Sequence, residues 1–291
     1  MNNLVQSLRP YQWPKQSIVV IPILSLGKSL SVDTVLHGLV AAITFSFIAS
    51  LVYIINDYFD LEEDRSDPIR KNRPLAAGAF SQSHAKILVI VLFCVGFAIN
   101  TTFASDVLST TMLLLLYLFL NLAYSKFQLK NQGILGISIV ASGFPLRFAF
   151  GCLYLNIQIS FWALAMLMQL SLFMLSVKRY QRTIRKTTTQ QNVASHEFWL
   201  LAATIFAAFF SASYAGFISS PTTQEVWGST ALLLSAIPLA LAIVRFLEVA
   251  TQPINWKSSD VTDSVLKDFP MVFLTIAYCS IMLLGSLTNV K

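Results

Sequence analysis

The chain has 291 residues, of which 55% are hydrophobic and 12% are charged. Soluble domains carry about 25% charged residues, so this composition excludes an ordinary soluble protein and indicates a polytopic membrane protein. The net charge of +6 is then a topology signal and not a sign of nucleic-acid binding, because basic residues gather in the cytoplasmic loops of membrane proteins.

Apolar stretches of about twenty residues, the length that crosses a bilayer, recur along the chain. We predict an all-α membrane protein with a single transmembrane domain over 1–291 and nine transmembrane helices. The expected spans are 16–30, 34–56, 84–104, 107–124, 133–154, 157–177, 198–219, 227–247 and 269–288. The first span is the weakest, because Pro22 and Gly27 interrupt it.

Basic residues give the expected orientation. If nine spans alternate, all but three of the 20 Lys and Arg residues fall on one side, the exceptions being Lys28, Lys291 and the intramembrane Arg147. The positive-inside bias then places the N-terminus and the long polar loops in the cytoplasm and the C-terminus outside. We expect the chemistry on the cytoplasmic face, because the loops near 57–83 and 178–197 lie there.

Residues 56–78 read NDYFDLEEDRSDPIRKNRPLAAG and directly follow the second apolar span. On a helix, the spacing of Asp57, Asp60 and Asp64 places three carboxylates on one face, at the membrane–water boundary. Such carboxylates repel one another unless a hard cation joins them, and Mg²⁺ binds carboxylate oxygens together with substrate phosphates. We therefore predict that these three residues are catalytic Mg²⁺ ligands and that Asn56 orients the site. A solvated, charged loop is the alternative.

Two arginines close this segment, in the run RKNRP at 70–74. A Mg²⁺-bound diphosphate keeps excess negative charge, and guanidinium forks match phosphate oxygens. Arg70 and Arg73 are therefore predicted substrate-binding residues. Anchoring of the loop on the cytoplasmic side is the alternative explanation of the same charges.

The series N-D-x-x-D-x-x-x-D, closed by N-R-P-L-x-x-G, resembles the first Asp-rich motif of the UbiA-type intramembrane prenyltransferase superfamily. The resemblance implies nine transmembrane helices around a lateral, lipid-accessible cavity. It also implies transfer of a group from a Mg²⁺-bound diphosphate. In the number of spans the resemblance covers the whole chain.

Superfamily members that use a prenyl diphosphate usually carry a second Asp-rich motif near the end of the sixth span. This chain instead reads SVKRYQR at 176–182, and no acidic residue occurs from 177 to 196. A basic cluster at that point suits an anion without Mg²⁺ of its own, such as a lipid monophosphate. We predict that Lys178 and Arg179 bind that phosphate, with cytoplasmic-side charge as the alternative.

Further segments are similar to one branch, the decaprenyl-phosphate phosphoribosyltransferases. They are LRPYQWPK at 8–15, AYS at 123–125 with LK at 129–130, SGFPLR at 142–147, KRY at 178–180 and DSVLKD at 263–268. That branch joins 5-phosphoribosyl diphosphate to a polyprenyl phosphate for cell-envelope lipid-linked sugars, so the resemblance implies this reaction at a bacterial inner membrane. The branch often has an Asp where this chain has Gly136, which leaves the donor's identity open.

Four more side chains are candidates for substrate contact. A charge inside a span costs at least a few kcal/mol unless it faces a partner or a wet cavity. We expect Pro145 to break the helix before Arg147, so that Arg147 reaches a phosphate; a structural ion pair is the alternative. Lys15 and Lys130 are further phosphate candidates. Tyr124 is a candidate contact, or else an interfacial aromatic residue.

The expected reaction is attack of a lipid phosphate oxygen on C1 of the donor, which needs no strong base because the phosphate is already anionic. The expected partners are the membrane, a polyprenyl phosphate and a diphosphate donor, with no nucleic acid. One alternative is prenyl transfer from a prenyl diphosphate to an aromatic acceptor in quinone-type lipid synthesis. That reaction predicts the second acidic cluster that is absent. The other alternative is a non-enzymatic lipid carrier or transporter.

Overall fold

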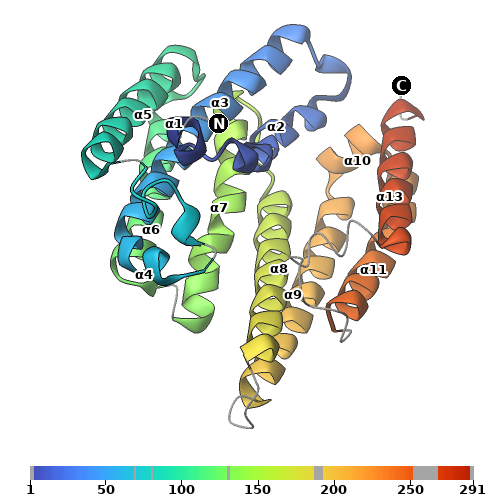
Figure 1. Cartoon of the computed structure of the whole chain (residues 1–291). Helices are drawn as coiled ribbons and strands as arrows, with labels where there is room; N and C mark the ends of the chain where they lie inside the picture. Colours follow the sequence, from blue (N-terminus) through green and yellow to red (C-terminus); the bar gives the residue numbers. More distant parts are fainter. Residues whose placement is uncertain are drawn as a thin grey trace. The chain divides into compact units, whose positions relative to one another are not determined.

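The computed structural model describes residues 3–68, 70–79, 81–129, 132–186, 193–251 and 268–288. Regular structure in these ranges is helical, and no strand occurs in them (Figure 1). The chain divides into two compact units, Met1–Ile159 and Ser160–Lys291. A single transferase domain over 1–291 stays a prediction.

The first unit begins with short helices and continues with four long ones. Its elements are α1 (Asn3–Ser7), η1 (Pro10–Gln16), α2 (Ser17–Val20), η2 (Ile21–Ser29), α3 (Val32–Phe59), α4 (Leu61–Ser66), η3 (Arg70–Asn72), α5 (Gln82–Phe103), α6 (Val107–Lys126) and α7 (Gly133–Tyr154). The second unit contains α8 (Phe161–Lys186), α9 (Val193–Ser219), α10 (Pro221–Trp227), α11 (Ser229–Thr251) and α13 (Phe269–Thr288). The elements named η are 3-10 helices.

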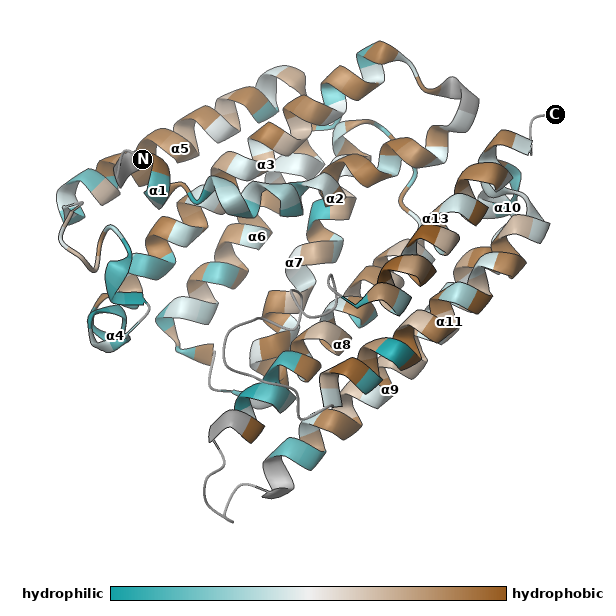
Figure 2. Cartoon of the chain, turned by 45° about the vertical axis from the view of Figure 1, so that its right-hand side comes forward, coloured by the Kyte–Doolittle hydropathy of each residue, from teal (hydrophilic) through white to brown (hydrophobic). Residues whose placement is uncertain are grey.

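Eight helices in the described ranges are long and apolar enough to cross a membrane, namely α3, α5, α6, α7, α8, α9, α11 and α13. Each overlaps one of the predicted spans. Figure 2 shows apolar residues along these helices, whereas α4 is mostly hydrophilic. The short helix α10 lies in the predicted outer loop near 219–227, where no helix was expected.

The first predicted span, 16–30, is not a continuous α-helix. Its residues form α2 and the 3-10 helix η2, and a kink at Gly27 has φ 51°. Pro22 stands at the start of η2, where its missing N–H and fixed φ are compatible with a helix start. The count of nine long helices is therefore not confirmed, and a ninth crossing stays a prediction.

Contacts with α3 nevertheless show the path of the N-terminal segment, here residues 9–23. Trp13 Nε1 donates to Ser50 Oγ at 3.1 Å, and a Cβ added at Gly38 would meet the side chain of Ile23. Since Arg9 contacts Asp57, the segment runs antiparallel to α3. Positions 57 and 38 are about 28 Å apart along an α-helix, and residues 9–23 cover about the same length at the longer 3-10 rise.

The helix α7 runs through Pro145 without a break, so the expected interruption before Arg147 was wrong. Proline removes one backbone hydrogen bond and crowds the carbonyl of residue i−4. In α7 this carbonyl is that of Ala141, whereas the Arg147 guanidinium donates to the carbonyl oxygen of Gly143.

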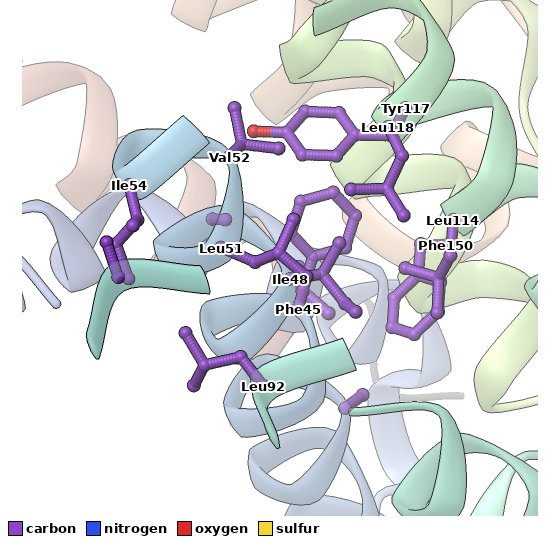
Figure 3. Packing of buried hydrophobic residues seen from close by; sticks show 14 of the residues in the cluster. Phe45, Ile48, Leu51, Val52, Ile54, Leu92, Leu114, Tyr117, Leu118 and Phe150 are labelled. Carbon is purple, nitrogen blue, oxygen red and sulfur yellow. The ribbon is translucent and has the colours of Figure 1, made fainter. Parts of the chain in front are cut away.

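The core of the first unit centres on α3. Figure 3 shows residues of α3 packed against α5, α6 and α7. The ring of Phe45 lies 4.9 Å from that of Tyr117 and 5.3 Å from that of Phe150, between ring centroids. In the second unit a separate cluster joins α8, α9, α11 and α13, with Phe173 and Phe246 rings 5.2 Å apart.

Candidate active site

The acidic series lies at the junction of α3 and α4. Asp60 separates the two helices, with φ −91° and ψ 8°. The backbone N–H of Asp60 donates to Asn56 O at 2.9 Å, and that of Asp64 donates to Asp60 O at 2.8 Å. These bonds keep the i to i−4 pattern of an α-helix, so the path stays nearly helical and Asp57 and Asp64 remain on one side.

Arg73 joins the two outer carboxylates of the series. Its Nη1 donates to Asp57 Oδ1 at 2.9 Å and to Asp64 Oδ2 at 2.7 Å. Both acidic side chains are almost fully buried, with 8% and 2% of their surface exposed. Two buried carboxylates thus converge on one cationic nitrogen, which offsets their mutual repulsion and their loss of hydration.

Two more arginines complete this acidic–basic cluster. Arg9, which precedes η1, donates through Nη2 to Asp57 Oδ1. Arg70 forms ion pairs with Glu63, Asp64 and Asp67 at 3.0–3.1 Å. The cluster therefore contains Arg9, Arg70 and Arg73 together with Asp57, Asp64, Glu63 and Asp67.

The two buried carboxylates offer oxygen ligands of the kind that a divalent cation binds. Arg70 Nη1 lies 3.1 Å from Asp64 Oδ1, yet this buried oxygen accepts no hydrogen bond, so it keeps coordination capacity. Carboxylate oxygens are the ligands that Mg²⁺ prefers. Across the described ranges, no three Asp, Glu, His or Cys side chains gather closely enough to hold a metal ion. The assignment of Asp57, Asp60 and Asp64 as ligands stays a prediction.

Other predicted site residues belong to the first unit. Asn56 Oδ1 accepts a hydrogen bond from Ser125 Oγ at 2.6 Å, which links α3 to α6. Tyr124 is half-buried next to Ser125, and Lys15 is exposed at the end of η1. Lys130 lies outside the described residues.

Arg147 is buried in α7, with 6% of its surface exposed. Its guanidinium donates to Gln16 Oε1 at 2.8 Å, to Gly143 O at 2.5 Å and to Tyr117 OH at 3.0 Å. The rings of Phe45 and Tyr117 each lie 5.2 Å from its Cζ. No carboxylate of the described residues pairs with it, so neutral acceptors and aromatic faces take the place of the structural ion pair considered above.

Lys178 and Arg179 belong to α8 in the second unit, where both are half-buried. Arg179 Cζ lies 6.0 Å from the centroid of the Trp199 ring, so α8 and α9 meet there. A guanidinium over an indole face gains a cation–π interaction. The roles of both residues stay predictions.

Sequence reasoning missed three residues with prominent contacts. Arg9 was assigned to topology and to the LRPYQWPK segment, although it pairs with the acidic series. Gln16 and Tyr117, the partners of Arg147, carried no signal of their own.

The fold and this cluster define an integral, multi-pass membrane transferase. The chain matches the model of the UbiA prenyltransferase family over residues 17–257, and it belongs to that family. The resemblance of its acidic motif to this family is thereby confirmed.

Relatives and solved structures agree with this membership. The decaprenyl-phosphate phosphoribosyltransferase of Mycobacterium tuberculosis is 30% identical over 289 residues, which covers 94% of this chain and 91% of the relative. The enzyme of the same name from Corynebacterium glutamicum is 30% identical over 259 residues, covering 84% and 76%. A UbiA homologue from Archaeoglobus fulgidus, bound to DMAPP and Mg²⁺, has a TM-score of 0.66 at 15% identity, covering 99% and 98% of the two chains. This last likeness concerns the fold.

Proposed function

We propose that the protein transfers a 5-phosphoribosyl group from 5-phosphoribosyl diphosphate to a polyprenyl phosphate. The observation that carries the proposal is the acidic–basic cluster, in which Asp57 and Asp64 converge on one cationic nitrogen of Arg73. Such a site has ligands for a metal and forks for the anion that the metal accompanies. The similarity to two decaprenyl-phosphate phosphoribosyltransferases supports this donor and this acceptor.

The residues have separate tasks in the proposed reaction. Asp57, Asp60 and Asp64 hold Mg²⁺, which when bound neutralises charge on the departing diphosphate. Arg70 and Arg73 bind diphosphate oxygens through their guanidinium forks. Asn56, held by Ser125, orients the end of α3.

Bond changes occur at C1 of the ribosyl group. The bond from C1 to the diphosphate oxygen breaks and the diphosphate leaves with the electron pair. An oxygen of the lipid phosphate forms the new bond to C1 from the opposite side. That oxygen is already anionic, so no side chain has to remove a proton.

The basic pair on α8 supports a lipid phosphate as the acceptor. Lys178 and Arg179 stand where users of prenyl diphosphates have acidic ligands, and the sequence contains no acid from 177 to 196. We expect Lys178 and Arg179 to bind the acceptor phosphate directly. Lys15, Tyr124, Lys130 and Arg147 are further candidates for contact with either substrate.

A donor screen with the purified full chain tests the proposal. The protein is incubated with Mg²⁺, decaprenyl phosphate and radiolabelled 5-phosphoribosyl diphosphate, and lipid-extractable label is measured. A parallel reaction supplies a labelled prenyl diphosphate with an aromatic acceptor. We expect label only from the phosphoribosyl donor. Label from the prenyl donor alone would overturn the proposal in favour of prenyl transfer.

The acceptor site is tested by replacing Lys178 and Arg179 together with Ala. Each lost charge-assisted contact should raise the acceptor KM or lower kcat/KM by about ten- to hundredfold. The donor KM should change little. The matched control is Arg182→Ala, which removes an exposed cation of the same helix. Wild-type acceptor kinetics in the double variant would assign Lys178 and Arg179 to topology alone.

A further inference from the structure

Within the acidic–basic cluster, Arg9 and Asp57 are the paired residues that lie farthest apart in the sequence. Arg9 Nη2 donates to Asp57 Oδ1 across 48 positions, and the Arg9 side chain is 15% exposed. The guanidinium also lies over the ring of Tyr53, with 5.2 Å between Cζ and the ring centroid. A cation so enclosed is placed with a defined orientation, unlike a mobile surface charge.

The backbone around Arg9 is held in an unusual conformation. Arg9 has φ 50° and ψ 58°, in the left-handed region that side chains other than glycine rarely adopt. Ser50 Oγ donates to Leu8 O at 2.8 Å, and Trp13 Nε1 donates to Ser50 Oγ at 3.1 Å. One residue of α3, Ser50, thus anchors the chain on both sides of Arg9, and backbone strain of this kind clusters at functional sites.

Asp57 Oδ1 is a shared acceptor whose hydrogen-bonding capacity is already used. It already accepts from Arg9 and from Arg73 Nη1. A divalent cation bound to the same oxygen would repel both guanidinium groups, because like charges in a poorly hydrated site repel strongly. A diphosphate offers these guanidinium groups anionic oxygens in exchange for Asp57.

We infer that Arg9 couples metal binding to diphosphate binding. It competes with a divalent cation for Asp57, and it binds a diphosphate oxygen once Asp57 is given up to the cation. Linkage requires that the metal then raises the affinity for diphosphate by the same factor as diphosphate raises the affinity for the metal. This inference rests on the proposed function only in that the site takes a metal-bound diphosphate.

Two titrations of the purified full chain in detergent test the coupling. The first measures the Kd of Mn²⁺ alone, from the electron paramagnetic resonance signal of the free ion. The second measures the Kd of the preformed complex of Mn²⁺ with inorganic diphosphate, by calorimetry. For Arg9→Gln we expect Mn²⁺ alone to bind several-fold tighter and the complex to bind about tenfold weaker, the effect of one lost charge-assisted contact.

Two further variants separate the effect of a direct contact by Arg9 from the general effect of a positive charge near the site. Arg9→Lys keeps the charge without the fork, so Mn²⁺ alone should bind as in the wild type and the complex about threefold weaker. Arg65→Gln removes a nearby exposed cation that pairs with Glu62, and it should change either Kd less than twofold. Thermal unfolding of each variant checks folding, and Arg9→Lys carries the test if Arg9→Gln does not fold.

The inference is overturned if Arg9→Gln shifts both Kd values in the same direction, or if both Arg9 variants match the wild type within twofold. It is also overturned if the wild-type chain binds neither probe. Opposite shifts in Arg9→Gln uphold it even when the donor screen finds no phosphoribosyl transfer. Conversely, transfer with unchanged Kd values upholds the proposed function and overturns the coupling by Arg9.

Discussion

Asp64 is the most buried carboxylate of the acidic series, with 1% of the residue exposed. One of its oxygens accepts from Arg73 Nη1 at 2.7 Å, and the other accepts no hydrogen bond. Burying this carboxylate costs hydration free energy. Its removal would nevertheless be unfavourable, because neighbouring cations would then lack a partner. The side chain therefore has both a structural partner and spare capacity for a metal.

We expect Asp64→Asn to lower kcat at least about a hundredfold, because the amide keeps the shape of the side chain but loses the charge that binds a metal. Steady-state transfer assays at saturating Mg²⁺ measure this. The matched control is Asp106→Asn, which changes a cap of α6 that accepts from Ser109 N at 3.0 Å. Asparagine also caps helices, so this control should keep full activity. Equal activity of the two variants would remove Asp64 from the site.

Replacing Arg147 shows whether this cation within a membrane-spanning helix has a structural role. Its contacts with Gln16, Gly143 and Tyr117 join the N-terminal segment, α7 and α6. We expect Arg147→Met to lower the free energy of unfolding by about 3 kcal/mol, because it leaves buried polar partners unsatisfied. Chemical unfolding in detergent micelles measures this. A variant as stable as the wild type, with a raised substrate KM, would instead favour the predicted phosphate contact.

At the scale of elements, α2 and α7 approach closely at one glycine. A Cβ added at Gly151 would lie 1.9 Å from the carbonyl oxygen of Val19, a backbone atom that cannot turn aside. We expect Gly151→Ala to destabilise the protein by about 1–3 kcal/mol through overpacking. The control is Gly96→Ala, whose Cβ would come within 3.4 Å of the Ile48 side chain alone, nearest to its flexible end, Cδ1, at 2.8 Å. Similar melting temperatures for both variants would contradict the close approach.

The start of α13 is tied to α11 by Arg245, which donates to both carboxylate oxygens of Asp268 at 3.1 and 2.7 Å. The guanidinium lowers the pKa of Asp268 below its usual range. A lowered folded-state pKa contributes stability above the unfolded value of about 3.9, and this contribution is lost as the pH falls through the folded value.

We therefore expect Asp268→Asn to lower the melting temperature at pH 7, by about 2–4 °C. The difference from the wild type should shrink as the pH falls from about 4 through the lower folded-state pKa, because the folded wild-type carboxylate then becomes protonated. Melting curves of both proteins across that range measure this. A difference that stays constant with pH would exclude the ion pair as its cause.

For the whole molecule, the basic residues predict which side of the membrane each loop occupies. We expect labelling from the cytoplasmic side for single cysteines at Ser66 and Thr188, and from outside for one at Thr222. The background replaces Cys94, Cys152 and Cys279. Membrane-impermeant maleimide applied to intact cells and to inverted vesicles of a bacterial host measures the side. Outside labelling at Thr188 would refute the alternation of spans.

The eight long helices and the acidic series could be predicted from the sequence, because hydropathy and spacing act along one segment. The sequence also pointed to the family through residues 56–78. It could not show that 16–30 avoids a continuous α-helix, because length and hydropathy alone do not determine helix type. The proline in α7 misled for a related reason, since whether a membrane helix continues through a proline depends on its surroundings in the fold.

Only the tertiary structure decided which charged and polar side chains meet. Arg9 and Asp57 lie 48 positions apart, and Gln16 and Arg147 lie 131 apart. No local pattern relates such residues, because their distance depends on how the N-terminal segment runs along α3 and packs on α7. The sequence by itself thus determined the helices and the chemical groups at their ends. The packing of those helices determined that two buried carboxylates meet three arginines, because a buried charge without a partner is strongly destabilising.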